Sequence, residues 1–366
     1  MSHSLGSIGK LTALILTLVT TQVFFGCAPA APAPTSTSAP KAAATIAPAK
    51  APGAEAKTGL AQIVDAANKE GKVVWYESSP ETDIAKVAAE FNKKYPAIKV
   101  EQVRLTGADV GTRILTESQA GGPTADVGTS GAEVPYELNK QGIVAHVNWA
   151  DLGIDPKLAP SPEAVSTTAA TYVVVINTKL VSDAEAPKSW DDLLNPKWKG
   201  RIGTWIQPQF QAQLVPAWGA DKTTEWVKKF AAQQPVFKQS TFPISEAVAA
   251  GELPLGVIVY HTAKPLLEKN APIKIIVLDP TPVTMLHSFI PTKASHPNAA
   301  KVFMAWLHST EGNLAYENAT GRGNPKISGT ATAKLLAGKN LSEYPYDKQN
   351  EFSKWLKEYG GIMSGK

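Results

Sequence analysis

Hydrophobic and polar positions follow two alternating periods from about Gly59 onward. The run at 72–76 is rich in β-branched and aromatic residues and predicts a strand, whereas Ile84, Val87 and Phe91 recur at helical spacing and predict a helix. Strand followed by helix, repeated along the chain, predicts a parallel sheet with helical crossovers. The further predicted strands are 98–103, 125–128, 172–176, 201–205, 255–260 and 273–278.

The segment 172–176 is apolar at every position, which is typical of a strand in the middle of a parallel sheet. Further helices are predicted at 190–194, from Ser245 to Gly251, and at 297–308, where apolar residues again gather on one face. No internal repeat is evident. The chain from about Gly59 is therefore expected to be an α/β protein.

Several helix starts follow directly after predicted strands. Ser78, Ser79 and Pro80 are typical of a helix start, with serine at the cap and proline in the first turn. Ser130 and Glu133 have the spacing of a capping box. Such helix ends expose unpaired backbone N–H groups and the positive end of the helix dipole, so they favour anions.

The N-terminus has the layout of a signal peptide. Lys10 precedes an apolar stretch, 11–25, which is shorter than the roughly 20 residues of a membrane span. Cys27 follows at once and is the only cysteine in the chain, so no internal disulfide can form. We expect residues 1–27 to direct export. The cysteine is either a lipidation site or incidental to an ordinary secretory signal.

Residues 28–57 are dominated by proline, alanine and threonine and show no apolar periodicity. Such a segment cannot bury enough apolar surface to offset the entropy of ordering it. We expect a disordered, extended segment. It acts either as a tether between a membrane and a domain or as filler.

Composition narrows the possible functions. The chain is 43% hydrophobic, carries a net charge of +4 and has no basic run, so binding to nucleic acid is not expected. No second apolar stretch is long enough to span a membrane. The roughly 300 remaining residues are many for a single core and suit two lobes.

Four segments together resemble bacterial extracellular solute-binding proteins, in particular the iron(III)-type group called family 1. The order and spacing of these segments carry the resemblance, which runs from about Lys72 to Pro325. The segments are 72–107, 115–131, 177–203 and 294–325. The position of Cys27 after the apolar stretch likewise resembles the bacterial lipobox, although Phe24 stands where leucine is usual. The resemblance implies lipidation of Cys27 and attachment to the outer face of a membrane.

The same resemblance implies a type II periplasmic-binding-protein fold. In that fold two α/β lobes are joined by a hinge, and the ligand binds in the cleft between them. The predicted lobe one is 58–165 plus about 280–335, and lobe two is 166–279 plus about 336–366. The implied function is capture of a small ligand, most simply an organic anion, and its delivery to the permease and ATPase of an ABC importer. The protein is expected to be a monomer that needs no cofactor.

Five candidate ligand-binding residues lie at the ends of the lobe-one strands. In open parallel sheets, ligands bind beyond the carboxyl ends of the strands. Each serine or threonine is alternatively a plain helix cap. The five candidates are Ser78, Ser79, Thr106, Gly107 and Ser130.

Three further candidates lie in lobe two. Trp205 follows a strand and either stacks on a ligand or packs in the core. Tyr260 and His261 stand where the iron-binding members of the resembling group have two adjacent tyrosines. Iron(III) prefers oxygen donors, so the replacement by His261 favours an organic ligand over iron. The pair is alternatively a strand-end aromatic and a helix cap. If iron is the ligand, Tyr260 and His261 are the expected donors.

Other functions have less support in the sequence. There is no GxSxG, P-loop or HExxH motif, so an enzyme is not expected, although a triad assembled from distant residues stays open. Two other functions remain as alternatives: an iron(III)-binding protein of a ferric importer, and a ligand-binding receptor for a sensor kinase.

Overall fold

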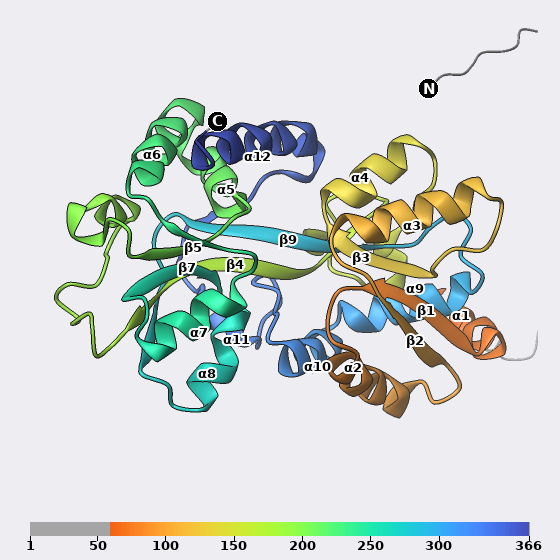
Figure 1. Cartoon of the computed structure of the whole chain (residues 1–366). Coiled ribbons are helices and arrows are strands. Elements are labelled where there is room, and N and C mark those ends of the chain that lie inside the picture. The colour runs from red at the N-terminus through yellow and green to blue at the C-terminus, as the bar shows by residue number, and fades with distance from the viewer. Residues whose placement is uncertain (1–58, 366) are drawn as a thin grey trace, which may run out of the picture. The chain divides into compact units, whose positions relative to one another are not determined.

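The computed structural model describes residues 59–365, which belong to one compact unit, Glu55–Lys366. The predicted signal segment 1–27 with Cys27, and the predicted tether 28–57, lie outside the described residues. Strands and helices alternate through most of the described part, as the periodicity predicts. Two long strands connect two α/β halves, here called lobe one and lobe two (Figure 1).

Lobe one contains a parallel set of strands in the order β2-β1-β3. Helices cover both faces of this set (Figure 1). The strands are β1 (Lys72–Glu77), β2 (Lys99–Arg104) and β3 (Val127–Gly131). The helices are α1 (Gly59–Glu70), α2 (Glu81–Lys94), α3 (Ala108–Gln119), α4 (Glu133–Lys140), α9 (Pro297–Leu307) and α10 (Thr310–Thr320).

Lobe two repeats this arrangement, with β5 parallel to both β6 and β7. Its strands are β5 (Ile202–Trp205), β6 (Val236–Lys238), β7 (Leu255–Val259) and β8 (Ile273–Ile276). Its helices are α5 (Gln209–Trp218), α6 (Ala220–Ala232), α7 (Phe242–Ala250), α8 (Lys264–Glu268), α11 (Ala331–Leu335) and α12 (Gln349–Met363). Short 3-10 helices, including η3 (Trp190–Leu194) and η5 (Tyr260–Thr262), and a two-residue strand, β10 (Leu341–Ser342), complete the fold.

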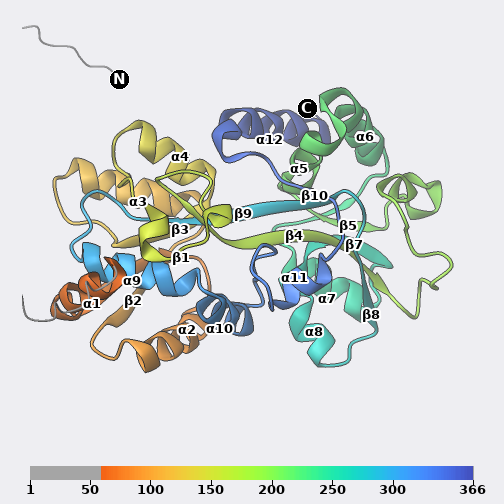
Figure 2. The same ribbon diagram turned by 180° about the vertical axis from the view of Figure 1, so that it is seen from behind.

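Two long strands, β4 (Val165–Asn177) and β9 (Thr281–Phe289), run from one lobe into the other (Figures 1 and 2). They pair with each other antiparallel; β9 also pairs with β3 of lobe one, and β4 with β7 and β8 of lobe two. The apolar run at 172–176 is therefore in the middle of a sheet, but its neighbours are antiparallel, which corrects the expected parallel surroundings. The run is apolar because both of its faces are covered.

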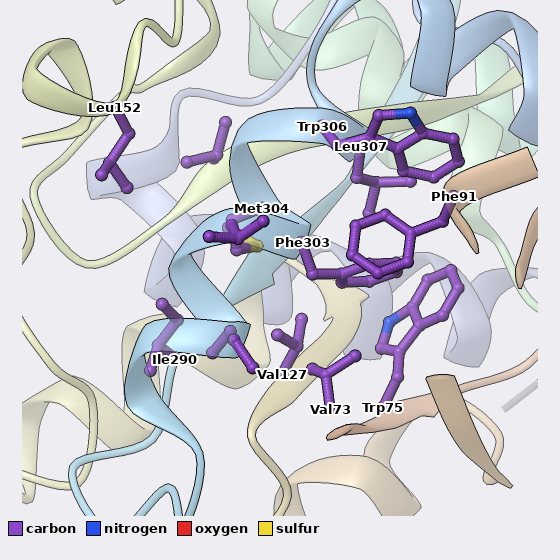
Figure 3. Close-up of a cluster of buried hydrophobic side chains, with 14 of the residues drawn as sticks. Val73, Trp75, Phe91, Val127, Leu152, Ile290, Phe303, Met304, Trp306 and Leu307 are labelled. Carbon is purple, nitrogen blue, oxygen red and sulfur yellow. The ribbon is translucent and has the colours of Figure 1, made fainter. Parts of the chain in front are cut away.

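The lobes have separate hydrophobic cores. In lobe one, Trp75 of β1 packs edge-on against Phe303 of α9, with ring centroids 5.0 Å apart, and Phe91 of α2 packs against Phe303 and Trp306 (Figure 3). This cluster takes residues from 67–165 and 290–327, whereas the main cluster of lobe two takes residues from 172–278 and 344–363. Each lobe can thus stay rigid on its own.

Two helix caps differ from the sequence-based prediction. Helix α2 has Pro80 at its N-cap, and no side chain caps it, because Ser78 and Ser79 point to partners elsewhere. Ser130 belongs to β3, and Ala132 is the N-cap of α4, so the expected capping box with Glu133 does not form. In both places the strand extends beyond its apolar residues, to Glu77 in β1 and to Gly131 in β3, so the helix begins later than the sequence pattern indicates. Within residues 59–365, no helix is long and apolar enough to cross a membrane.

Candidate functional site

A cavity of about 280 Å³ lies where β1, β3, β5 and β7 end at their carboxyl termini. This is the edge at which open α/β sheets bind ligands. Residues from both lobes and from β4 and β9 line it, so it is an interlobe cleft. The lining residues are Ser78, Gly131, Glu133, Ala170, Tyr172, Trp205, Gln209, Ser240, Thr241, Phe242, Val259, His261, Thr262, Thr284, Leu286 and Arg322.

Arg322 enters the cleft from the end of α10. Gly321 ends that helix in the left-handed conformation, with φ of +76°, and a Cβ at this position would lie 3.2 Å from the His261 Cβ. Glycine thus allows both the turn and the close approach to lobe two. Arg322 Nη1 donates to Ser78 Oγ at 3.2 Å, and Arg322 Nε donates to His261 Nε2 at 3.4 Å. The guanidinium therefore contacts residues of both lobes.

The partners of Arg322 are neutral. Ser78 contributes an uncharged hydroxyl. The pKa of His261 lies well below its usual value, because the ring is desolvated and faces the Arg322 charge, so the ring is neutral. No ion pair of Arg322 with an acidic side chain occurs in the described part of the chain. The guanidinium has five N–H donors, and its two contacts leave donors available.

Behind Ser78, a buried carboxylate organises the end of β1. Glu77 is 1% exposed and accepts hydrogen bonds from the Ser79 backbone N–H at 2.8 Å, Gln102 Nε2 at 2.6 Å and Tyr316 OH at 3.2 Å. Burial raises the pKa of Glu77, and these donors together with the Arg322 charge oppose the rise. The bonds fix the loop that carries Ser78, because a buried carboxylate is costly unless its oxygens are satisfied.

His261 begins the lobe-two side of the cleft, in η5 directly after β7. Its Nε2 accepts from Arg322, so the proton of the neutral ring belongs on Nδ1, which is buried and has no partner. Phe242 packs edge-on against the ring, with centroids 5.6 Å apart. A buried donor without a partner at the edge of a cleft is suited to a ligand oxygen.

Glu133, the first residue of α4, is the one carboxylate that lines the cavity. It is half-buried, and its carboxylate lies over Gly131, where a Cβ would collide with it. Burial raises the pKa of Glu133, while its own backbone N–H lowers it. The Glu133 charge contributes to raising the pKa of the Tyr172 hydroxyl, which is chiefly raised by burial.

An apolar wall on the lobe-two side is built by Trp205 and Phe242. Trp205 ends β5, and its Nε1 donates to the Gln239 carbonyl at 3.0 Å, which fixes the indole plane. Phe242 is 47% exposed, an unusual position for a large apolar ring at a helix start. Both rings face the cavity and offer surface for the apolar part of a small organic ligand.

Comparison with known proteins decides the family. Residues 86–341, more than half of the chain, match the family described as bacterial extracellular solute-binding protein. The chain belongs to this family. It is a substrate-binding protein of an ABC importer, located outside the cytoplasm, and members of this family bind and release solutes without catalysis.

Relatives of this solute-binding protein have diverse ligands. An Fe(3+)-binding periplasmic protein of Serratia marcescens is 27% identical over 292 residues, which cover 73% of this chain and 85% of that protein. A substrate-binding protein of an ABC transporter from Agrobacterium tumefaciens superposes with a TM-score of 0.68 at 20% identity, covering 80% of this chain and 94% of that one.

A third relative holds an organic phosphate. The periplasmic binding protein AfuA of Actinobacillus pleuropneumoniae, with fructose-6-phosphate bound, superposes with a TM-score of 0.64 at 21% identity and covers 79% of this chain and 98% of that one. At such identities the structural matches establish the fold, and they confirm the expected two-lobed α/β architecture.

The cleft of this solute-binding protein brings together three of the eight candidate residues, namely Ser78, Trp205 and His261. The other five do not line it. Ser79 is buried against Tyr316 OH, at 3.2 Å, and Thr106 Oγ1 donates to the Asp109 carboxylate. Gly107 is the N-cap of α3, and Ser130 Oγ donates to its carbonyl at 3.5 Å. Tyr260 is outside the lining, and burial, with a smaller contribution from the Glu317 charge, raises the pKa of its hydroxyl.

Sequence reasoning missed Arg322 and Glu133 as site residues. Arg322 lies in Gly321-Arg322-Gly323, and a cation between two glycines after a helix is the one signal that was available. Glu133 was interpreted as half of a capping box. Arg322 and Glu133 are identified as candidate site residues only because both line the same cavity.

Proposed function

We propose that this solute-binding protein captures a small organic molecule through an anionic group held by Arg322. The observation that supports this most is the position of Arg322, a guanidinium in the cleft with neutral partners from both lobes. A carboxylate or phosphonate can accept two parallel hydrogen bonds from a guanidinium, and charge-assisted bonds are the strong ones. Ser78 Oγ and His261 Nδ1 supply further polar contacts for the same group.

Iron(III) fits these residues less well. Among residues 59–365, no group of three or more histidine, cysteine, aspartate or glutamate side chains is placed to hold a metal ion. Of the expected iron donors, Tyr260 does not line the cavity, and His261 is in contact with a guanidinium, which repels a metal cation. Tyr172 does line it, but burial raises the pKa of its hydroxyl, which disfavours the phenolate.

Ligand binding is proposed to close the two lobes. Arg322 and Ser78 are on the lobe-one side and His261 and Trp205 on the lobe-two side, so one small ligand contacts both. The connecting strands β4 and β9 are the place where the lobes can move relative to each other. Closure is favoured only as far as the ligand binds the closed form better than the open one, and the permease is proposed to recognise the closed form.

The test is a thermal-shift screen of the full chain against carboxylates, phosphonates and organic phosphates. A correct ligand at 100 times its Kd stabilises the folded protein by about 2.7 kcal/mol. Arg322→Gln should lose the shift, whereas Arg201→Gln, an exposed arginine outside the lining, should keep it. A shift with iron(III) that Arg322→Gln leaves unchanged would contradict the proposal.

We further propose that the mature protein is anchored to the membrane by lipid at Cys27. The predicted signal layout and the single cysteine support this. Wild-type protein should then partition with membranes, and Cys27→Ser should be released or left unprocessed. Deletion of residues 28–53 should leave the ligand affinity unchanged, because the cleft is built entirely from residues after them.

A further inference from the structure

The cleft contains a second charge that an anionic ligand alone leaves without a partner. Arg322 and Glu133 are the two side chains in its lining that have a charged form near neutral pH, since His261 and Tyr172 are both held neutral. Burial raises the pKa of Glu133 and so opposes its ionisation. A ligand that brought only an anion would neutralise Arg322 and leave the half-buried Glu133 without a cation to favour its ionised form.

Glu133 has no counter-ion among residues 59–365. No lysine, arginine or histidine of the described residues forms an ion pair with its carboxylate, in contrast to Glu137 one helical turn later, which lies 2.8 Å from Lys140 Nζ. The groups that shift the pKa of Glu133 are its surroundings and its own backbone N–H, whereas Arg322 acts on Glu77, His261 and Tyr316. The two cleft charges thus lie in separate electrostatic surroundings.

The surface beside Glu133 is suited to a short ligand chain. Tyr172 and Ala170 of β4 and Leu286 of β9 line the same cavity and present mainly apolar surface. The sequence places Gly131 under the carboxylate, and any larger residue there would displace it from its present position. A ligand with its charges at two ends of a short apolar segment would match Arg322, this surface and Glu133.

We propose that the ligand is a zwitterion, whose anionic group binds Arg322 and whose ammonium group binds Glu133. This rests on the proposed anion site at Arg322 and narrows its substrate class to small amino-carboxylates or amino-phosphonates. The ammonium supplies the counter-ion that Glu133 lacks. Such a pair adds affinity because the carboxylate is already partly desolvated before the ligand arrives.

The experiment measures Kd of the full chain by calorimetry for five matched series. These are linear ω-amino acids with three to six carbons, the plain carboxylic acids, the ω-hydroxy acids, and the corresponding alkyl and aminoalkyl phosphonates. At the best length, we expect the amine to tighten binding at least about tenfold over both the plain acid and the hydroxy acid, which corresponds to about 1.4 kcal/mol.

Substitutions test whether Glu133 is the residue that tightens binding of the amine-containing ligands. Glu133→Gln should remove the preference for the amine and leave binding of the plain acid equal or tighter. The matched control Glu137→Gln changes the same residue type on the exposed side of the same helix and should keep the preference. Arg322→Gln should weaken amino acid and plain acid alike. Circular dichroism melting of each variant checks that it is folded.

Three results would contradict the inference, and they are distinguishable. If plain acids bind as tightly as amino acids and Glu133→Gln changes nothing, the zwitterion is wrong while the anion site stands. If the hydroxy acids bind best and Glu133→Gln weakens them, Glu133 accepts a ligand hydroxyl instead. If no member of any series binds, the anion site at Arg322 is wrong, and the inference is wrong with it.

Discussion

Glu317 and Arg322 lie five positions apart in sequence, yet the Glu317 carboxylate is fully hydrogen-bonded within the protein whereas the Arg322 guanidinium has donors left over for a ligand. Glu317 is 4% exposed and accepts hydrogen bonds from the backbone N–H groups of Ala331 and Thr332 and from the Thr332 hydroxyl, at 2.6 to 2.8 Å. It is saturated by the N-terminus of α11. Arg322 contacts two neutral groups and faces the cleft.

This difference separates structural charges from those available to a ligand. A buried charge is tolerated when the protein itself supplies its partners, as at Glu317. Arg322 and Glu133, which form no ion pair among the described residues, both line the interlobe cavity. The comparison predicts that Glu317 matters for stability and that Arg322 and Glu133 matter for binding.

The largest effect is expected from Glu317→Ala. It leaves three donors at the start of α11 unsatisfied, so the free energy of unfolding should fall by about 3 kcal/mol. Urea denaturation measures this directly. Arg322→Gln in the same assay should lower stability less than Glu317→Ala does, because its two hydrogen bonds go to neutral groups and it acts on the buried Glu77 only through its charge. Equal losses in the two variants would remove the distinction.

The next effect concerns pH and buried histidines. Burial lowers the pKa of His308 to about 4, although its Nδ1 donates to the Met304 carbonyl. The unfolded histidine binds a proton near pH 6.5 and the folded one does not, so the free energy of unfolding falls as the pH drops from 6.5 toward 4. At pH 5, His308 alone lowers the free energy of unfolding by about 2 kcal/mol relative to neutral pH.

The variant His308→Gln should therefore lose less stability between pH 7 and pH 5 than the wild type, by about 2 kcal/mol. His146→Gln is the control, because that ring is exposed. Comparing changes between two pH values cancels any constant cost of the substitution. Parallel pH profiles for His308→Gln and the wild type would show that the ring is protonated in the folded state.

The smallest effect is expected at the apolar wall. Trp205→Ala should weaken binding of the ligand found in the screen by about 1 kcal/mol, because an aromatic contact is worth about that much beyond its buried area. Ile206→Ala is the matched control, since this neighbour is 46% exposed and outside the lining. Calorimetry at one temperature gives both values. An equal change in the two variants would show that Trp205 has a structural role and does not contact the ligand.

Much of the fold could be predicted from the sequence because its signals are local. The runs at 72–76 and 255–260 have the composition of buried strands, and Gly251 closes its helix as expected, although the helix begins at Phe242 and not at Ser245. Strand β9 was missed because Pro282, Thr284 and the polar pair His287 and Ser288 interrupt its apolar pattern. The Ser288 hydroxyl is hydrogen-bonded by Thr129 and Thr167, and His287 Nε2 by Ser166, all from other strands.

The candidate site could be predicted only in part, because it depends on contacts across long stretches of sequence. Arg322 meets Ser78 from 244 positions away and His261 from 61 positions away. A local sequence pattern cannot predict that residues so far apart in the chain are in contact. Ser79 is the opposite case: its residue type suits a helix cap or a ligand contact, yet its hydroxyl is hydrogen-bonded to Tyr316, 237 positions away.

The most direct measurement is a crystal structure of the full chain with the tightest anionic ligand from the screen. We expect an oxygen of the anionic group within about 2.7–2.9 Å of a guanidinium nitrogen of Arg322, with Ser78 and His261 beside it. A ligand that binds in the cleft without touching Arg322, or iron(III) held by the Tyr260 hydroxyl, would contradict it.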